Sequence, residues 1–287
     1  MIDITRERER ENHTDIKRIV KLPKDIDILT YSFPCQDLSQ QGKQRGMNQN
    51  TRSGLLYEVE RILNENTDRL PKILLLENVK ALVSKKFIGD FEKWIDILDK
   101  IGYKSKYKVL NAANYGSSQN RERVFMVSIL KSEKIDFEFP NKEIQIKSKL
   151  NKIINNPYDG NNLNHLFNYK MNEFVKTKNN IVKSKLCDYT NFNSEAYIYK
   201  TNSLGPTLTA SGANSRLKFY FEKEKIIRYI NEIEAYQYMG FDIKDALKVK
   251  ESKLISPNKM IFTAGNSICV EVLEAIFKTI KECYERK

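Results

Sequence analysis

The sequence predicts an α/β fold, because short apolar runs of strand length alternate with amphipathic helices. Two such runs, 26–30 and 72–76, are rich in isoleucine and leucine. Between and after them, apolar residues recur at the spacing of a helix face that packs on a sheet. Open α/β sheets bind ligands at the carboxyl ends of their strands. The residues that end these runs are therefore the first candidates for a functional site.

The run 26–30 is interpreted as a buried strand that must end at Pro34, because proline has no N–H to donate to a strand ladder. Cys35 follows the carboxyl end of this strand, where a thiol is exposed enough to react. A cysteine taken at random is more often a buried structural residue. The polar, flexible segment 37–42 that follows favours the reactive alternative here.

The alternation continues as far as residue 130. A polar loop at 42–51 leads into a helix, and the second buried strand ends at Glu77-Asn78-Val79. A later helix ends at Gly102, a residue typical of helix C-termini. Two further strands are expected to pair around the turn at Tyr115-Gly116. The expected elements are a helix at 55–63, a strand at 72–76, a helix at 91–101, and strands at 107–110 and 124–129.

Residues 131–227 have a different composition. They are rich in asparagine and lysine, show little apolar periodicity, and contain interspersed tyrosine and phenylalanine. This interval holds 16 Lys and Arg residues against 10 Asp and Glu. Asparagine-rich sequence also arises in AT-rich genomes, so composition alone does not identify base contacts.

The last part, 228–287, returns to helical patterns. Asn231 to Ala235 is typical of a structural helix, and Thr263 to Ser267 is expected to cap a long helix. Apolar residues at 268, 272, 275, 276 and 280 give that helix a face that is expected to pack on the sheet.

Composition limits the classes of partner. The 287 residues carry 49 Lys and Arg against 37 Asp and Glu, a net charge of +12, which suits a polyanion without proving one. No apolar run approaches the ~20 residues of a membrane span, and the charged first residues do not form a signal peptide. The four cysteines lack metal-ligand spacing, so we expect no metal and a reducing cytoplasm.

Four short motifs, in order, resemble those of the C5-cytosine DNA methyltransferase family of bacterial restriction–modification type. They are Pro34-Cys35-Gln36, Glu77-Asn78-Val79, Gln119-Asn120-Arg121-Glu122-Arg123 and Gly265-Asn266-Ser267. The resemblance extends from Asp15 to Ile276. It implies a Rossmann-like α/β sheet that binds S-adenosylmethionine, together with a smaller, irregular target-recognition domain. The expected domains are a catalytic part at 1–130, a recognition domain at 131–227, and a return to the catalytic domain at 228–287.

The resemblance also implies a mechanism, in which a thiolate adds to C6 of a cytosine that has left the DNA stack. Cys35 would be the nucleophile, Glu77 would contact N3, and Arg121 would hold O2 with support from Arg123 and Gln119. The remaining matches fall into two groups. The expected cofactor residues are Asp15, Ile16, Pro34, Leu55, Asn266 and Ser267, and the expected DNA residues are Gln36, Ser39, Arg52, Thr207 and Leu208.

One family motif has no counterpart. The family opens with a glycine-rich turn around the methionine part of the cofactor, and this sequence has no glycine before Gly42. The sheet is therefore expected to be N-terminally truncated, with the strand at 26–31 left as an exposed edge. A second polypeptide would then have to supply the motif, or the chain would be an inactive fragment.

Three alternatives remain beside a DNA methyltransferase that acts on double-stranded DNA in the bacterial cytoplasm, close to the nucleoid. A tRNA cytosine methyltransferase would use the same residues, but such relatives tend to have a reduced recognition region. A catalytically silent DNA-binding protein would fit the missing turn. A thiol enzyme acting on another pyrimidine would not explain the motif at 119–123.

Overall fold

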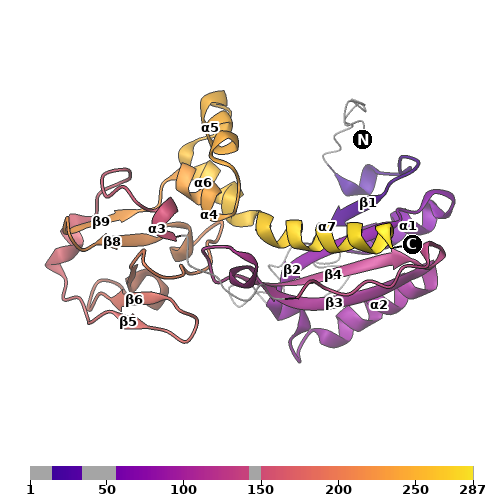
Figure 1. The fold of residues 1–287 in the computed structure, drawn as a ribbon, viewed down its shortest axis with the longest axis horizontal. Helices are drawn as coiled ribbons and strands as arrows, with labels where there is room; N and C mark the ends of the chain where they lie inside the picture. Colours follow the sequence, from indigo (N-terminus) through magenta and orange to yellow (C-terminus); the bar gives the residue numbers. More distant parts are fainter. Residues whose placement is uncertain (1–14, 34–55, 142–149, 287) are drawn as a thin grey trace. The chain divides into compact units, whose positions relative to one another are not determined.

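The computed structural model describes residues 15–33, 56–141 and 150–286 (Figure 1). They form two compact units. The first comprises 1–108 and 124–136, and the second comprises 109–123 and 137–287. These units do not coincide with the expected domains, since 109–123 and 228–287 group with the recognition region.

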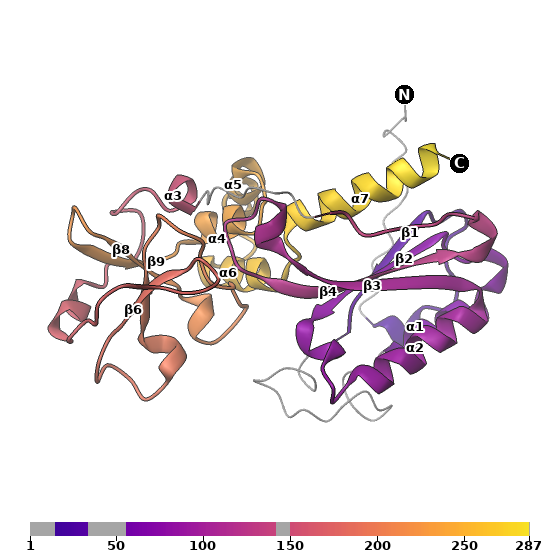
Figure 2. The same cartoon turned by 60° about the horizontal axis from the view of Figure 1, so that its bottom comes forward.

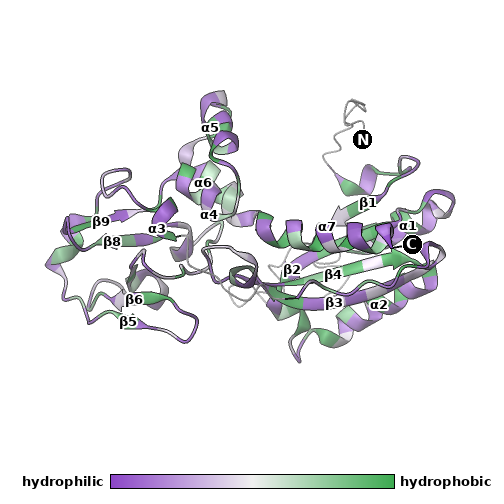
Figure 3. Ribbon diagram, viewed as in Figure 1, coloured by the Kyte–Doolittle hydropathy of each residue, from purple (hydrophilic) through white to green (hydrophobic). Residues whose placement is uncertain are grey.

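The first unit is built on a four-stranded sheet with the order β1-β2-β4-β3. The strands are β1 (Ile28–Tyr31), β2 (Ile73–Val79), β3 (Tyr103–Asn111) and β4 (Glu122–Leu130). β1 runs parallel to β2, with Ile28 opposite Ile73 and Tyr31 opposite Leu76. Pairing of the last two strands is confirmed, because β3 and β4 are neighbours. Figure 3 shows apolar residues along β2 and β4, as expected of strands covered on both faces.

Two α-helices belong to this unit, α1 (Leu56–Glu65) and α2 (Ile88–Ile101), and Figure 2 shows α2 lying along one face of the sheet. Phe91, Trp94 and Leu98 recur at helical spacing and are buried. Gly102 ends α2 with φ +119°, and its N–H bonds to the carbonyl of Leu98. The predicted helix at 91–101 is thus confirmed, with its start three residues earlier.

β1 differs from the interpretation of 26–30 as a buried strand, whereas its place at the edge of the described sheet matches the expected position of 26–31. Its residues alternate between exposed and half-buried, and Ile28 is 36% exposed. The reason is its position, since β1 stands at the edge of the sheet within the described residues. β2, with neighbours on both sides, has four consecutive buried residues from Ile73 to Leu76.

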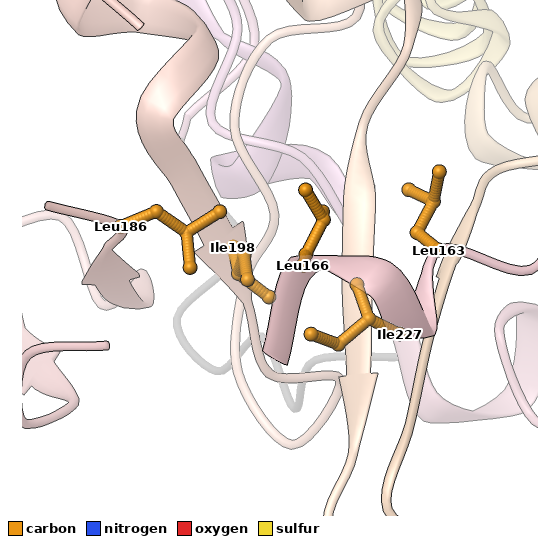
Figure 4. Close-up of a cluster of buried hydrophobic side chains, with 5 residues drawn as sticks. All are labelled: Leu163, Leu166, Leu186, Ile198 and Ile227. Atoms are coloured by element: carbon orange, nitrogen blue, oxygen red, sulfur yellow. The ribbon is translucent and has the colours of Figure 1, made fainter. Parts of the chain in front are cut away.

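The second unit contains a five-stranded sheet with the order β5-β6-β7-β8-β9, where an irregular domain was expected. All five strands have four residues or fewer, which is too short for clear periodicity in the sequence. All pairs are antiparallel except β7 with β8. Leu163, Leu166, Leu186, Ile198 and Ile227 form the apolar cluster beneath it (Figure 4). The strands are β5 (Val175–Lys176), β6 (Val182–Lys185), β7 (Tyr197–Tyr199), β8 (Lys218–Phe221) and β9 (Ile226–Tyr229).

The other helices of the described residues are the following. The α-helices of the second unit are α3 (Leu150–Ile153), α4 (Glu232–Tyr238), α5 (Ile243–Ser252), α6 (Pro257–Asn266) and α7 (Val270–Glu285). Short 3-10 helices are η1 (Ile16–Arg18), η4 (Thr67–Arg69), η5 (Lys80–Val83), η6 (Ala112–Tyr115), η7 (Lys131–Glu133), η8 (Asn164–Asn168), η9 (Asn193–Ala196) and η10 (Ala213–Ser215).

The start of the last helix was predicted wrongly. Thr263 to Asn266 form the final turn of α6, and α7 begins at Val270 after Cys269. Helical periodicity runs through both helices, so the sequence pattern does not reveal the break at Ser267. The expected packing of α7 on the sheet stays a prediction.

Among the described residues, the stretch Pro257–Glu285 is long and apolar enough to cross a membrane by length and composition alone. It comprises two helices, α6 and α7, separated by three non-helical residues. One helical span needs about 20 consecutive apolar residues. Each of the two helices also buries its apolar face, through Met260 and Ala264 in α6 and Val272 and Ile276 in α7. We therefore interpret α6 and α7 as two amphipathic helices that each pack through one apolar face.

Candidate functional site

Arg121 is the centre of the site residues in the second unit. Its side chain is 4% exposed, and its guanidinium donates to three backbone carbonyls. Nη1 lies 2.7 Å from the oxygen of Leu208, and Nη2 lies 3.2 Å from that of Gly265 and 3.0 Å from that of Ser267. Arg121 therefore joins three expected site segments that are far apart in the sequence. A guanidinium with fixed, forked donors suits this role better than an ammonium.

Gln119 makes a second connection between the motif and the segment around Leu208. Its Oε1 accepts from the N–H of Leu208 at 3.2 Å, and its Nε2 donates to the carbonyl of Tyr238 at 2.8 Å. Thr207 donates through Oγ1 to the carbonyl of Asn120 at 2.6 Å. The motif at 119–123 thus holds Thr207 and Leu208 through both side chains and backbone.

Arg123 lies in a different environment from Arg121. It is half-buried, and Nη1 donates to the carbonyl of its neighbour Glu122 at 2.9 Å. The described geometry therefore commits Arg121 to the protein backbone and leaves Arg123 as the more accessible of the two guanidinium groups. The sequence did not distinguish them, because burial depends on the segments that surround the strand entry.

Asn266 and Ser267 do not lie at the N-terminus of a long helix, as was expected, but at the C-terminus of α6. Asn266 is exposed, whereas Ser267 donates through Oγ to the carbonyl of Ala264 at 2.7 Å. A helix C-terminus does not favour an anionic group through its dipole. Contacts of these residues with the cofactor would therefore depend on their side chains and on the loop between the helices.

In the first unit, the carboxyl ends of β1 and β2 are tied together. Ser32 donates through Oγ to the carbonyl of Glu77 at 2.8 Å, and Nδ2 of Asn78 donates to the carbonyl of Phe33 at 3.2 Å. Asn78 is 2% exposed, whereas Glu77 is half-buried. These bonds hold the backbone of Glu77 and the side chain of Asn78 beside Ser32 and Phe33, the residues that precede Pro34 in the sequence.

Asp15 caps the 3-10 helix η1, where its Oδ1 accepts from the N–H of Lys17 at 3.0 Å. Arg61 of α1 anchors this turn by donating to the carbonyl of Ile19 at 2.9 Å. Asp15 is exposed and Ile16 half-buried, a pair that offers a carboxylate acceptor and an apolar surface side by side. This pair fits the amino group and ring of an adenine, so the described residues are compatible with the adenosyl part of S-adenosylmethionine.

Several expected site residues lie outside the described residues. They are Pro34, Cys35, Gln36, Ser39, Arg52 and Leu55. Within the described residues, no group of three or more His, Cys, Asp or Glu side chains could hold a metal ion.

Cys269 is a buried thiol near Arg121, and its environment does not suit a nucleophile. It is 2% exposed, and burial raises its pKa to about 11 even though the nearby charge of Arg121 opposes the shift. At neutral pH this thiol stays protonated, and the thiolate is the nucleophilic form. Cys269 is therefore not a competitor of Cys35 for the catalytic role.

Two residues of this arrangement were missed by the sequence analysis. Tyr238 is fully buried and donates through its hydroxyl to the carbonyl of Pro206 at 2.7 Å. Gly205 packs directly against that hydroxyl. Neither carries a sequence signal of its own beyond a glycine before a proline, which indicates a turn.

The fold and these motif contacts define a methyltransferase of the Rossmann-like class. The family model described as C-5 cytosine-specific DNA methylase matches residues 3–282, and the chain belongs to this family. It is accordingly a DNA (cytosine-5-)-methyltransferase that uses S-adenosylmethionine.

Curated relatives cover nearly the whole chain. The orphan methyltransferase M.SssI of Spiroplasma monobiae is 49% identical over 94% of this chain and 69% of its own length. The type II methyltransferase M2.ScrFI of Lactococcus lactis subsp. cremoris is 34% identical over 94% of this chain and 71% of its own.

Solved structures support the fold alone. The Dnmt2 methyltransferase of S. pombe matches with a TM-score of 0.59 and 16% identity, over 94% of this chain and 84% of that one. The methyltransferase EhMeth of Entamoeba histolytica matches with a TM-score of 0.60 and 15% identity, over 97% and 84%.

Proposed function

We propose that this enzyme methylates C5 of cytosine in double-stranded DNA through a covalent adduct with Cys35, after the base has left the helix. The observation that supports this most directly is the bonding of the motif at 119–123 to Thr207 and Leu208. It brings together two segments that the resemblance assigns to the target base. We further propose that the enzyme acts in the bacterial cytoplasm, near the nucleoid.

Cytosine C5 is a weak nucleophile, so the ring must first be activated. The thiolate of Cys35 adds to C6 and the ring electrons move toward C5. Glu77 protonates or hydrogen-bonds N3, which stabilises the developing charge. S-adenosylmethionine, when bound, supplies the methyl group as a sulfonium. Loss of the C5 proton then allows the bond between Cys35 and C6 to break, which restores the aromatic ring.

The geometry changes the roles that we assign to the two arginines. Because the guanidinium of Arg121 donates to three backbone carbonyls, it serves as a positioning residue. Arg123, which is half-buried, is the better placed of the two to donate to O2 of the cytosine. This revises the expectation that Arg121 holds O2.

The test of the proposed function is tritiated methyl transfer, with double-stranded DNA and tRNA as parallel substrates. Transfer to DNA alone supports the proposal, whereas transfer to tRNA alone would favour the tRNA methyltransferase alternative. DNA that contains 5-fluorocytosine should trap a covalent complex, because fluorine at C5 prevents the final elimination. An enzyme that binds this DNA without a covalent complex would contradict the adduct with Cys35.

Residues 131–227 are expected to hold most of the sequence discrimination. In the sheet, Lys185 pairs with Tyr197, and Nζ of Lys183 lies 3.7 Å from the centre of the Tyr197 ring. This arrangement gives one sheet face both cationic and aromatic groups, and lysine contacts with phosphates make binding salt-dependent. Replacing the interval with that of a relative should move the methylated site. Bisulfite sequencing of a methylated plasmid gives the answer, and an unchanged site would place recognition elsewhere.

The sequence has no glycine before Gly42, and we propose that a second polypeptide supplies a glycine-rich turn to the cofactor site. Among the described residues β1 stands at the edge of the sheet, and an edge strand can pair with an added strand. Calorimetry of the purified chain with S-adenosylmethionine is expected to show no binding tighter than about 100 μM. Tight binding by the chain alone would contradict the proposal and would also exclude the alternative of an inactive fragment.

A further inference from the structure

The segment Gly205–Thr209 is held from two sides within the second unit. On one side, the N–H of Gly205 bonds to the carbonyl of Ser118, and the N–H of Asn120 bonds to the carbonyl of Gly205, both at 2.9 Å. Gln119 and Arg121 continue this contact to Leu208. The segment therefore has almost no independent freedom along the side that faces the motif.

On the other side, the segment lies against α4 and α6. The hydroxyl of Tyr238, in the last turn of α4, donates to the carbonyl of Pro206 at 2.7 Å. Gly265, near the end of α6, lies so close that a Cβ there would come within 2.3 Å of the carbonyl carbon of Thr209. The backbone of Gly265 packs directly against the backbone of Thr209 and Ala210, so there is no empty space between the segment and α6.

Tyr238 links the two sides. Its backbone carbonyl accepts from Nε2 of Gln119, while its hydroxyl holds Pro206. The side chain is fully buried, and this burial raises its pKa well above the usual value for tyrosine. The hydroxyl thus remains a hydrogen-bond donor throughout the pH range in which a methyltransferase works. A Cβ on Gly205 would lie only 1.9 Å from the same hydroxyl oxygen, so the glycine is required for this approach.

We propose that Tyr238 is a positioning residue for methyl transfer, whose hydroxyl sets the position of Thr207 and Leu208 relative to Gln119 and Arg121. This inference rests on the proposed function, in which those two residues border the target base. Tyr238 itself, being fully buried, does not touch the substrate.

The position of the segment also affects the recognition region. After Thr209 the chain forms η10, which contacts η9. Arg216, just beyond η10, lies 3.2 Å from the carboxylate of Glu195 in η9. A shift at Pro206 therefore propagates toward the loops of the recognition sheet, and target discrimination should change together with the rate.

The test uses Tyr238→Phe, which removes the hydroxyl and keeps the ring. Its matched control is Tyr236→Phe, because Tyr236 lies on the same helix but bonds through its hydroxyl to Thr263 at 3.0 Å instead of to the segment. A second variant, Gly205→Ala, displaces the hydroxyl from the opposite side. Its control is Gly89→Ala, where an added Cβ meets nothing within 4 Å.

We expect Tyr238→Phe and Gly205→Ala to lower kcat about 10-fold each, which corresponds to ~1.4 kcal/mol of lost transition-state stabilisation. The dissociation constant for DNA should change by less than about twofold, because phosphate contacts supply most of the affinity. Both controls should keep the wild-type kcat. All rates are compared at a temperature where circular dichroism shows every variant to be folded.

A wild-type kcat in Tyr238→Phe would overturn the inference. So would a loss in Tyr236→Phe equal to that in Tyr238→Phe, because the effect would then come from general loosening of α4. If Tyr238→Phe does not fold, Gly205→Ala decides, with a wild-type rate again overturning the inference. A wild-type chain that stays inactive even when the complementing polypeptide is present would instead contradict the proposed function.

Discussion

Cys35→Ser is expected to lower the rate of methyl transfer to below about one-thousandth of wild type, while DNA binding stays nearly unchanged. The substitution hardly alters volume, but it replaces a thiol, whose thiolate is the nucleophilic form, with a hydroxyl that remains protonated. Without the thiolate, nothing adds to C6 and the ring is not activated. Single-turnover transfer of tritiated methyl groups and gel-shift titration should be measured on the same preparation.

Cys187→Ser is the matched control, since Cys187 is a half-buried free thiol whose Sγ lies 3.2 Å from Oδ1 of Asn172. Serine keeps that hydrogen bond, so the rate should remain at the wild-type value. A Cys35→Ser enzyme that retained more than a few per cent of the rate would eliminate Cys35 as the nucleophile. If Cys35→Ser fails to form the 5-fluorocytosine adduct and Cys187→Ser still forms it, the assignment of Cys35 as the nucleophile is strengthened.

Arg121→Met is expected to have the second largest effect, on stability and activity together. Methionine fills most of the space but leaves the carbonyls of Leu208, Gly265 and Ser267 without their charged donor. Loss of a buried charged donor to several acceptors should lower the free energy of unfolding by about 3–5 kcal/mol. The rate should fall at least about 100-fold, because the three segments lose their common anchor. Urea denaturation and steady-state kinetics measure the two effects.

Arg123→Met separates positioning from direct contact with the base. Arg123 is half-buried and donates to a neighbouring carbonyl, so its replacement should change the free energy of unfolding by less than about 1 kcal/mol. If Arg123 contacts O2, its kcat should nevertheless fall as far as that of Arg121→Met. Equal stability losses in the two variants, or an unchanged kcat in Arg123→Met, would return the O2 contact to Arg121.

Much of the first unit follows from local sequence. The helix over 91–101 was predictable because its apolar spacing and Gly102 carry the information within one helix. The strand at 72–76 was predictable because a run of isoleucine and leucine is buried on both faces. The ordered motifs around Cys35, Glu77, Arg121 and Asn266 were sufficient to indicate the family, which the family model then confirmed.

Features that depend on distant parts of the chain could not be predicted in this way. The apolar residues of β1 suit a buried strand, and only the order of the strands in the described sheet shows that Ile28 lies at an edge and is 36% exposed. The strands of the five-stranded sheet β5–β9 are too short for periodicity and are stabilised by pairing and by the cluster around Ile198. The break between α6 and α7 interrupts a continuous helical pattern for the same reason, since it follows from contacts and not from composition.

The two arginines of the motif show the division most clearly. Their types and spacing, two residues apart at a strand entry, are present in the sequence and are enough to mark a functional site. Their different roles arise from burial, because Leu208, Gly265 and Ser267 surround Arg121 only once the chain has folded. The roles of Tyr238 and Gly205 likewise depend on the folded structure. The hydroxyl of Tyr238 donates to the carbonyl of Pro206 at 2.7 Å, across 32 residues of sequence, and Gly205 leaves room for that hydroxyl.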